Sequence, residues 1–225
     1  MRITKLLSYF QTLVRAIDYL FNRNFSEEKL LKKIIDDNSV VVDIGSNLGS
    51  FIKLVSKLNK NKSVYFYSIE PIKQLNFEQN KIVFPKAHNL KIINKAVIDS
   101  NQREIEFFER FIYSHSSINE ISNEQNVRKY TVEAVSFMNF IYEERIEKID
   151  LLKIDTEGLD FKIIKSIDKK YLKNNITNIK AEITHENIEI LNYLFQLGFN
   201  LIGINNISYK NNQLKLFDGY FSKSN

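Results

Sequence analysis

The sequence predicts an α/β protein built on a doubly wound, mostly parallel β-sheet, and three observations lead to this prediction. Residues 39–44 (SVVVDI) form a short, continuous, β-branched run that ends at Gly45, as expected of a parallel strand covered on both faces. Strand-like and helix-like segments alternate along most of the chain that follows. With 225 residues, of which 44% are hydrophobic, the chain can bury the core that such a sheet needs.

An N-terminal helical extension over residues 1–36 is expected to precede a main domain over residues 37–225. In residues 3–21 apolar side chains recur at spacings of three and four, which predicts an amphipathic helix. The apolar face of this predicted helix could bind a membrane surface. We favour packing on the domain or on a partner subunit, as in a homodimer, because the face also carries acidic and neutral polar neighbours. A second helix is predicted from Ser26, because two glutamates follow it directly.

The first half of the predicted sheet is a βαβαβ unit. Strands are expected at residues 39–44, 64–69 and 90–93, and helices at residues 48–58 and 72–82 lie between them. This alternation is typical of parallel strands joined by helical crossovers.

The second half continues the alternation after an interruption. Residues 103–109 and 130–135 read as extra strands or edge pieces, separated by a polar stretch at residues 113–129. The later elements are expected to be strands at 149–154 and 176–183, helices at 159–167 and 186–197, and two C-terminal strands near 199–208 and 213–221. We therefore expect one sheet with helices on both faces.

The basic composition is a weak sign of an anionic partner. The formal charge is +5 and the pI about 9.1, but 25 of the 32 basic residues are Lys, and no run of Lys or Arg is longer than two. Lys, Ile and Asn are abundant and have A/T-rich codons, so we attribute the basicity to the base composition of the genome. No nucleic-acid partner is expected.

Cysteine usage and hydropathy narrow the chemistry and the location. Without Cys the chain has no disulfide, no thiolate metal site and no cysteine nucleophile, and three His leave little for a zinc site, so no metal is predicted. No uncharged apolar run reaches the roughly 18 residues that span a bilayer, and the first residues lack a signal-peptide pattern. We expect no transmembrane segment and a cytoplasmic location.

A glycine turn follows the first predicted strand. Asp43 stands near the end of that strand, and Gly45, Asn47 and Gly49 lead from it into a helix, where a turn and a helix N-terminus face a ligand at the carboxyl edge of a parallel sheet. Asn is among the residues that best tolerate the positive φ of such a turn. Ser50 replaces the third Gly of a dinucleotide fingerprint, and no G-K-[ST] motif is present. Asp43 either caps the turn or has a cofactor role, holding the turn or reaching an ammonium group.

A carboxylate closes the second predicted strand. Glu70 stands at the strand tip, directly before Pro71, which can open the next helix. A carboxylate in this place can accept hydrogen bonds from both hydroxyls of a ribose. The alternative is an exposed acid at a helix start.

More acids follow the later strands. In residues 151–158 (LLKIDTEG) an apolar strand is followed by Asp155 and Glu157, and Glu182 and His185 come at the end of the next strand. These side chains are predicted to line one cleft at the sheet edge that carries the glycine turn. The alternatives are that Asp155 only orients a cofactor, that Glu157 caps a helix and that His185 is solvated.

Taken in order, these motifs resemble the FkbM family of S-adenosylmethionine-dependent methyltransferases. The resemblance covers residues 38–200 and rests on the segments VVDIGSNLGSF, EP, NKAVID, LLKIDTEGLD and a strand ending in EITH. Residues 136–139 (SFMN) differ from the family, which tends to have a Leu-Asp pair there, and the first 35 residues are not covered.

The resemblance implies a class I methyltransferase fold, which is Rossmann-like with a mostly parallel seven-stranded sheet, and S-adenosyl-L-methionine as the cofactor. It implies that Glu70 holds the ribose hydroxyls, that the backbone near Lys95 and Ala96 meets the adenine and that the glycine turn cradles the methionine part. The turn residues concerned are Asp43, Gly45, Ser46, Asn47 and Gly49.

Methyl transfer to a hydroxyl needs in-line positioning and a group that removes the hydroxyl proton. Asp155, Glu157 and His185 are the candidates for that group, and the paired acids also permit a divalent cation. We expect an O-methyltransferase that acts on a hydroxyl of a sugar, a glycosylated metabolite or another small molecule. Units of a bacterial surface polysaccharide fit what the resemblance implies.

Two other functions are compatible with the fold. An RNA or DNA methyltransferase has the basic pI as support, but the chain lacks a [DN]-P-P-[YFW] tetrapeptide and the Cys that cytosine C5 methylation requires. A non-catalytic module that binds S-adenosylmethionine is the second. The presence of Asp43, Glu70, Asp155 and Glu157 argues against such a loss of turnover.

Overall fold

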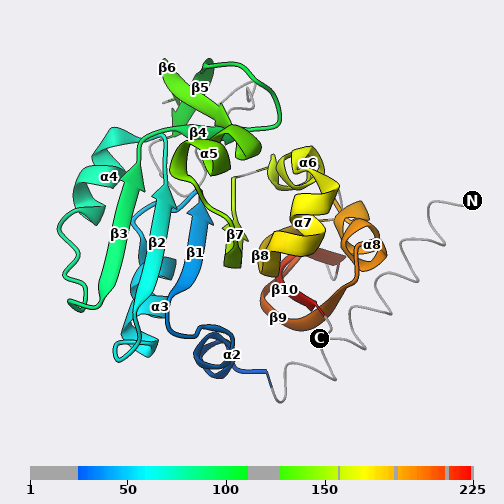
Figure 1. Cartoon of the computed structure of the whole chain (residues 1–225). Helices are drawn as coiled ribbons and strands as arrows, with labels where there is room; N and C mark the ends of the chain where they lie inside the picture. Colours follow the sequence, from blue (N-terminus) through cyan, green and yellow to red (C-terminus); the bar gives the residue numbers. More distant parts are fainter. Residues whose placement is uncertain (1–24, 111–126, 157, 185–186, 211–212, 224–225) are drawn as a thin grey trace, which may run out of the picture.

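The computed structural model describes residues 25–110, 127–156, 158–184, 187–210 and 213–223 (Figure 1). The predicted helix over residues 3–21 lies outside these ranges. The helices and strands, in chain order, are α2 (Glu27–Ile34), β1 (Ser39–Ile44), α3 (Ser50–Leu58), β2 (Val64–Ile69), α4 (Lys73–Gln79), β3 (His88–Ile93), β4 (Ala96–Ile98), β5 (Glu104–Arg110), β6 (Val127–Ser136), α5 (Phe137–Glu144), β7 (Ile149–Ile154), α6 (Asp160–Ser166), α7 (Lys169–Asn175), β8 (Ile176–Thr184), α8 (Glu189–Gln196), β9 (Phe199–Lys210) and β10 (Gln213–Lys223).

The main sheet has seven strands in the order β3-β2-β1-β7-β8-β10-β9. The first five are parallel to one another, and β10 is antiparallel to both β8 and β9. This confirms the predicted doubly wound, mostly parallel sheet. The chain moves outward from β1 to β3 and then returns to the other side of β1 with β7, so the strand order reverses between β1 and β7. Open α/β sheets bind ligands at the carboxyl ends of the strands beside such a reversal.

A separate three-stranded sheet, in the order β4-β6-β5, lies beyond the carboxyl ends of the main strands (Figure 1). The segments predicted as extra strands are its β5 and β6, which pair antiparallel, and β4 pairs parallel with β6. The sequence pattern does not predict β4, because three apolar residues are too short a run to distinguish from a loop. It also misses α5 and α7, and it extends the helix of α4 beyond its end at Gln79.

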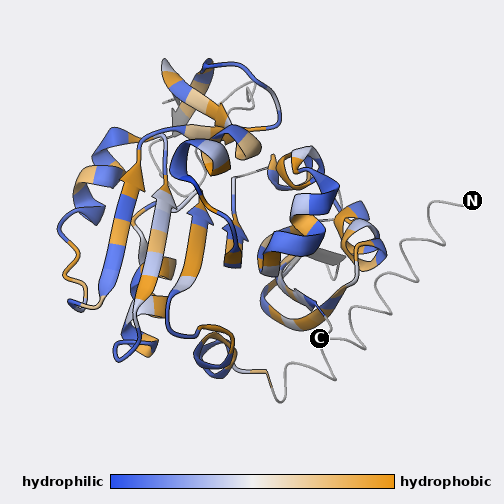
Figure 2. Cartoon of the chain, in the orientation of Figure 1, coloured by the Kyte–Doolittle hydropathy of each residue, from blue (hydrophilic) through white to orange (hydrophobic). Residues whose placement is uncertain are grey.

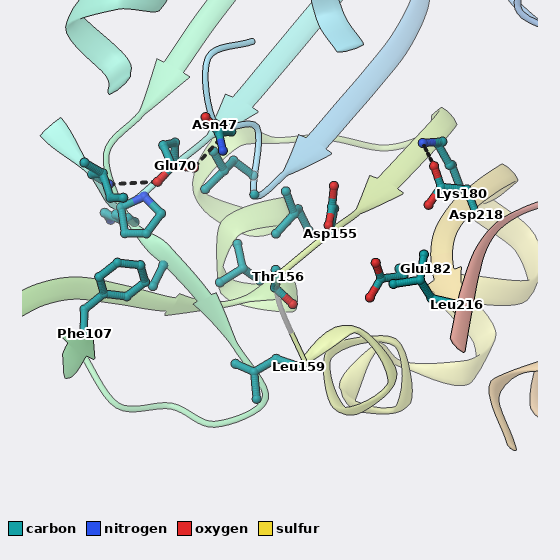
Figure 3. A pocket seen from close by; sticks show the side chains of 18 of the residues that line it. Asn47, Glu70, Phe107, Asp155, Thr156, Leu159, Lys180, Glu182, Leu216 and Asp218 are labelled. Carbon is teal, nitrogen blue, oxygen red and sulfur yellow. Dashed lines mark hydrogen bonds and ion pairs between the residues drawn. The ribbon is translucent and has the colours of Figure 1, made fainter. Parts of the chain in front are cut away.

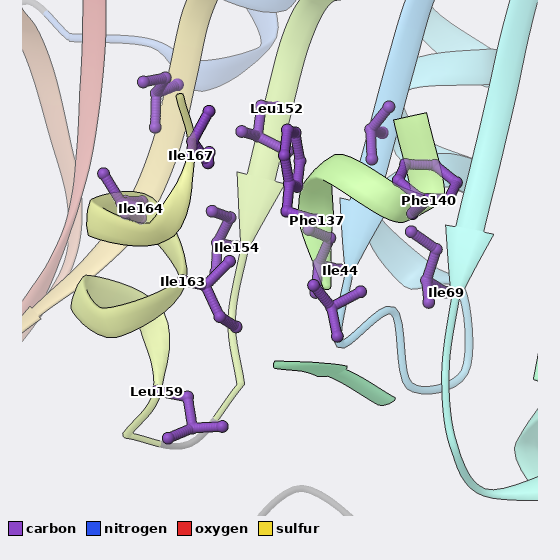
Figure 4. Close-up of a cluster of buried hydrophobic side chains, with 14 of the residues drawn as sticks. Ile44, Ile69, Phe137, Phe140, Leu152, Ile154, Leu159, Ile163, Ile164 and Ile167 are labelled. Atoms are coloured by element: carbon purple, nitrogen blue, oxygen red, sulfur yellow. The ribbon is translucent and has the colours of Figure 1, made fainter. Parts of the chain in front are cut away.

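Helices cover both faces of the main sheet, and each face has its own hydrophobic core. On one face, α5 and α6 pack side chains such as Phe137 and Ile163 against Leu152 of β7 (Figure 4). On the other face, α2 and α3 contribute Leu31 and Ile52 to a second cluster. Burial on both sides explains why β1 is mostly hydrophobic, whereas α4 and α7 show many hydrophilic residues (Figure 2).

One row of polar side chains crosses the second face of the sheet. Neighbouring strands place these residues in register, so their side chains lie on the same face. The row consists of Ser68 on β2, Asp43 on β1, Lys153 on β7, Lys180 on β8 and Tyr220 on β10. All five are buried, and we call them the polar row.

Residues before β1 dock onto the far end of the polar row. Glu27 of α2 accepts hydrogen bonds from the Tyr220 hydroxyl and from Asn205 Nδ2. Phe25 packs against the Tyr220 ring, with 5.7 Å between ring centroids, and occupies the space above Gly203, where a Cβ would lie 1.9 Å from its ring. The described part of the predicted extension therefore packs on the sheet. No described helix is long and apolar enough to cross a membrane.

Candidate active site

A cavity of about 420 Å³ opens at the carboxyl ends of β1, β2, β7 and β8 (Figure 3). The small sheet contributes Ala96, Val97 and Phe107 to its wall, and the strand pair β9–β10 contributes Asn206 and Asp218. The volume lies within the range of roughly 300–1,000 Å³ that is usual for small-molecule sites. The cavity therefore lies where the reversal of strand order predicts a ligand.

The glycine turn forms one wall of the cavity. Gly45, Asn47 and Gly49 have φ angles of +72°, +51° and +72°, so three residues of this turn adopt the left-handed conformation. Gly45 has a second constraint, because a Cβ there would lie 1.9 Å from the carbonyl oxygen of Asp155. Glycine thus allows the end of β1 to approach the end of β7, and Asn47 has the left-handed conformation expected of it.

Glu70 holds the loops after β1 and β2 together. The backbone N–H of Asn47 donates to Glu70 Oε2 at 2.9 Å, and that of Ile72 donates to Oε1 at 3.0 Å (Figure 3). The side chain is 5% exposed, and burial raises the pKa of Glu70 to about 7, although both backbone hydrogen bonds lower it. Glu70 is therefore a cavity carboxyl group that titrates near neutral pH.

Neutral polar side chains of β2 and α4 support the glycine turn. The Ser68 hydroxyl contacts Ser46 Oγ at 2.7 Å, and Gln79 of α4 donates through Nε2 to Ser46 Oγ at 3.0 Å and to the carbonyl oxygen of Asn47. Ser68 also bonds to Gln79 Oε1. This network fixes the turn against β2 and α4 without ionised groups.

Lys153 connects the end of β1 with the end of β7. Its Nζ lies 2.9 Å from Asp43 Oδ1, 3.3 Å from Asp155 Oδ2 and 3.4 Å from the carbonyl oxygen of Gly45. Burial by itself would lower the pKa of Lys153, but Asp43 and Asp155 together raise it above its ordinary value. The ammonium group therefore stays charged although its side chain is 8% exposed.

Asp160 shapes the loop that follows β7. Its buried carboxylate accepts hydrogen bonds from the backbone N–H of Thr156 at 3.1 Å and of Gly158 at 3.3 Å. Burial, and after it the charge of Asp155, raise the pKa of Asp160. The loop places Asp155 and Thr156 on the cavity wall.

Charged side chains form the wall on the β8–β10 side. Lys180 pairs with Asp218 at 2.5 Å, and Asn206 Nδ2 donates to the same carboxylate oxygen at 2.8 Å. Glu182 lies opposite Asp218 in the β8–β10 register and also lines the cavity (Figure 3). Counting Glu70 and Asp155, four carboxyl groups and two lysines, Lys95 and Lys180, line the described wall.

The structure separates the predicted site residues into three groups. Those that line the cavity are Gly45, Asn47, Glu70, Lys95, Ala96 and Asp155. Asp43, Ser46 and Gly49 are buried behind the wall, and the carboxylate of Asp43 contacts Lys153 instead of the cavity. Glu157 and His185 lie outside the described residues. Asp155 and Glu182 do line one cavity, as predicted, and no three His, Asp or Glu side chains of the described ranges gather into a metal site.

Several residues of this site have no role predicted from the sequence. Lys153 and Lys180 each stand inside an otherwise buried strand, and an ionisable residue in such a strand is a signal that a sequence can provide. Gln79, Asp218 and Phe107 give no comparable signal, because similar residues occur on most amphipathic helices and on most strands with one exposed face.

The comparison with protein families finds the methyltransferase FkbM domain at residues 43–201. Similar solved structures include an rRNA methylase from Streptococcus thermophilus (15% identity, 88% of this chain and 94% of that chain, TM-score 0.49). A methyltransferase FkbM from Methylobacillus flagellatus KT has 12% identity over 82% of this chain and 44% of that chain, with a TM-score of 0.48. TrmK of M. capricolum, solved with S-adenosyl-homocysteine, has 13% identity over 89% and 69%, with a TM-score of 0.45.

A search of curated proteins finds no match. The family match extends over more than half of the chain and includes the glycine turn, Glu70 and the loop after β7. The chain therefore belongs to the FkbM family of S-adenosylmethionine-dependent methyltransferases.

Proposed function

We propose that this methyltransferase binds S-adenosylmethionine in the cavity between the glycine turn and Glu70, and methylates a hydroxyl oxygen of a sugar, a glycosylated metabolite or another small molecule. One observation carries the cofactor site: the turn after β1 and the acid after β2 open onto the same cavity. The acceptor class comes from the family resemblance and from the charge of the wall.

The wall suits a nucleoside. Each oxygen of Glu70 accepts one backbone N–H, and because a carboxylate offers about four lone-pair sites, each oxygen keeps one for a ribose hydroxyl. Pro71, Ala96, Val97 and Phe107 provide apolar surface beside Glu70, which suits a purine ring. Lys95 and Ala96 stay our candidates for backbone contacts with the adenine.

The turn suits the methionine part of the cofactor. Gly45 and Asn47 line the cavity, and Ser46 and Gly49 shape the turn from behind it. Asp43 has no exposed surface, so we assign it an indirect role through Lys153. These residues leave backbone groups of the turn accessible where a side chain at Gly45 would not fit.

The chain's part in the reaction is positioning and proton removal. When bound, S-adenosylmethionine supplies an activated methyl group. Asp155 is our candidate for the base that accepts the acceptor's hydroxyl proton, because its side chain is 45% exposed and lines the cavity. Glu157 follows β7 in the sequence and His185 follows β8, and both remain candidates for this base.

The charge of the wall favours a neutral, hydroxyl-rich acceptor over a nucleic acid. Four carboxyl groups face two lysines in the described wall, and phosphate-rich ligands bind most readily where basic groups predominate. Carboxylates also accept hydrogen bonds from hydroxyl groups. RNA, which the basic pI of about 9.1 would support, stays the alternative acceptor.

Methyl transfer from labelled S-adenosylmethionine to separate glycan, lipid, small-molecule and RNA pools tests this proposal. Label should enter a hydroxyl of a glycan or small molecule, and label in RNA alone would contradict the acceptor class. Asp155→Asn should lower the transfer rate by about 10²–10⁴-fold while S-adenosylhomocysteine affinity stays within about threefold. Equal losses of rate and affinity would limit Asp155 to holding the cofactor.

Binding and assembly need separate measurements. Millimolar S-adenosylhomocysteine should raise the melting temperature, because a ligand of the native state stabilises it; no shift would contradict the cofactor site. Binding without transfer to any pool would favour the non-catalytic alternative. We also propose a homodimer through the helix predicted at residues 3–21, which light scattering of the chain with and without residues 1–24 would test.

A further inference from the structure

Lys153 makes three contacts with one ammonium group. Its acceptors are Asp43 Oδ1 at 2.9 Å, Asp155 Oδ2 at 3.3 Å and the carbonyl oxygen of Gly45 at 3.4 Å. An ammonium group has three N–H donors, so the three acceptors use its full capacity. Two of these partners, Gly45 and Asp155, line the cavity, whereas the third does not.

Neutralising Asp43 does not require all three contacts. Asp43 is fully buried, and its second oxygen, Oδ2, has no hydrogen-bond partner in the part of the chain that the structure describes. Its one ion pair, with Lys153 Nζ at 2.9 Å, already supplies the opposite charge. The remaining two contacts reach across from β7 to the turn after β1 and forward to the half-exposed Asp155 carboxylate.

The surroundings leave Lys153 little freedom. Its side chain is 8% exposed, and the ring of Phe51, on the helix that follows the glycine turn, lies 5.9 Å from Nζ. Lys180, the next cation of the polar row, lies over the same ring at 5.5 Å. A charge in such a place is retained only where several partners compensate for lost water.

We propose that Lys153 is a positioning residue of the active site, whose ammonium group joins the carbonyl oxygen of Gly45 to the carboxylate of Asp155. It thereby sets the glycine turn and the candidate base relative to each other. This role rests on the proposed function, because it concerns the same cavity. Without Lys153, the turn and Asp155 lose their shared partner, and the Asp155 carboxylate can turn towards solvent.

The test compares Asp43→Asn with the double variant Asp43→Asn/Lys153→Met, by calorimetric titration with S-adenosylhomocysteine and by thermal unfolding. A neutral pair of similar volume often replaces a buried ion pair without loss of stability, so the double variant should unfold within about 5 °C of Asp43→Asn. Its affinity for S-adenosylhomocysteine should nevertheless be at least about tenfold weaker than that of Asp43→Asn.

Equal affinities of these two variants would overturn the proposal, because Lys153 would then only compensate the charge of Asp43. Lys153→Arg provides a second measurement: it keeps a charged donor, and should retain more affinity than Lys153→Met. If the two single variants lose affinity equally, the positioning role is also contradicted.

Lys148→Met is the matched control. Lys148 precedes β7, at the end of the strand opposite the cavity, and pairs with Asp150 at 2.7 Å, but its side chain is 63% exposed and is not part of the cavity wall. This variant should bind S-adenosylhomocysteine like the wild type. If the wild type does not bind S-adenosylhomocysteine, the proposed function itself is contradicted. A difference between variants tests only the role of Lys153.

Discussion

The β1–β2 side of the cavity and its β8–β10 side hold their residues by different means. On the first side backbone N–H groups bond to Glu70, and the neutral amide of Gln79 supports the turn. On the second side ionised side chains hold each other in place, as Lys180 and Asp218 do at a distance of 2.5 Å. Lys153 stands between the two and contacts both backbone and carboxylates.

This difference determines which changes each side tolerates. A wall made of closely approaching backbone depends on shape, because the interior has no space for added atoms. A wall made of charges depends on the presence of both partners, because an unpaired buried charge is costly whatever its shape. Substitutions that change volume should therefore damage the first side most, and substitutions that change charge should damage the second.

Gly45→Ala should have the largest effect. The added Cβ would lie 1.9 Å from the carbonyl oxygen of Asp155, at a φ of +72° that Ala rarely adopts. Left-handed strain and overpacking together should lower the free energy of unfolding by roughly 2–5 kcal/mol. Gly198→Ala is the control, because its φ of +86° is equally strained but nothing lies within 4 Å. Denaturant unfolding should show a clearly smaller loss there, and equal losses would refute the close approach.

Lys180→Met should have the next largest effect, through charge rather than shape. It leaves the mostly buried Asp218 with Asn206 as its described partner, and the free energy of unfolding should fall by roughly 3 kcal/mol. Lys180→Met/Asp218→Asn should recover most of that loss. Lys91→Met, which breaks an ion pair whose lysine is 59% exposed, should change stability by less than about 1 kcal/mol. Urea titrations of the wild type and these three variants measure the changes. A loss in Lys180→Met no larger than that in Lys91→Met would contradict the prediction.

Glu70→Gln should weaken S-adenosylhomocysteine binding by about 10–100-fold. A glutamine has one acceptor oxygen for two backbone N–H groups, so one donor of the Asn47 and Ile72 pair loses its partner. Calorimetry measures the change. Glu78→Gln on α4, where the acid pairs with Lys81 at the surface, should leave affinity unchanged. Wild-type affinity in Glu70→Gln would remove Glu70 from the proposed ribose contact.

The pH dependence should be the smallest effect and should belong to the first side. Burial raises the pKa of Glu70 from 4.5 to about 7, because the folded protein holds the neutral carboxyl group more readily than the carboxylate. The stability that the neutral group contributes is complete below about pH 4.5 and is lost as the pH rises through about 7. Ribose hydroxyls favour the ionised form of Glu70. The affinity for S-adenosylhomocysteine should therefore strengthen as the pH rises towards 7, by up to about tenfold per pH unit. Titrations from pH 6 to 8 should show this slope in the wild type and not in Glu70→Gln.

Much of the main sheet could be predicted because its signals are local. The run at β1 is continuous and β-branched, and it ends in a glycine turn whose Asn47 does adopt a positive φ. Glu70 and Asp155 could be predicted at one edge because parallel strands end on the same side. The prediction fails where the signal is short or weak: β4 has three residues, and α5 begins after Ser136, whose hydroxyl caps the helix by accepting from the Asn139 N–H.

The cavity itself could not be predicted to the same extent. Phe107 reaches its wall from a second sheet, and Asp218 pairs with Lys180 across 38 residues of chain. No local pattern encodes these pairings, because they depend on how β10 inserts between β8 and β9. The same holds for Asp43, which the sequence places beside the turn and the fold buries against Lys153.

Sequence alone determined the fold class, the turn after β1 and the acids that follow the strands, because hydrophobic period, β-branching and glycine position act over a few neighbouring residues. Tertiary structure decided which of those acids line the cavity and which are buried behind its wall, because strand register sets side-chain direction across the whole sheet. Asp43 and Asp155 both contact Lys153, yet one is fully buried and the other is 45% exposed. That difference comes from their places in the register, because Asp43 lies inside β1 and Asp155 lies just beyond the end of the neighbouring strand β7.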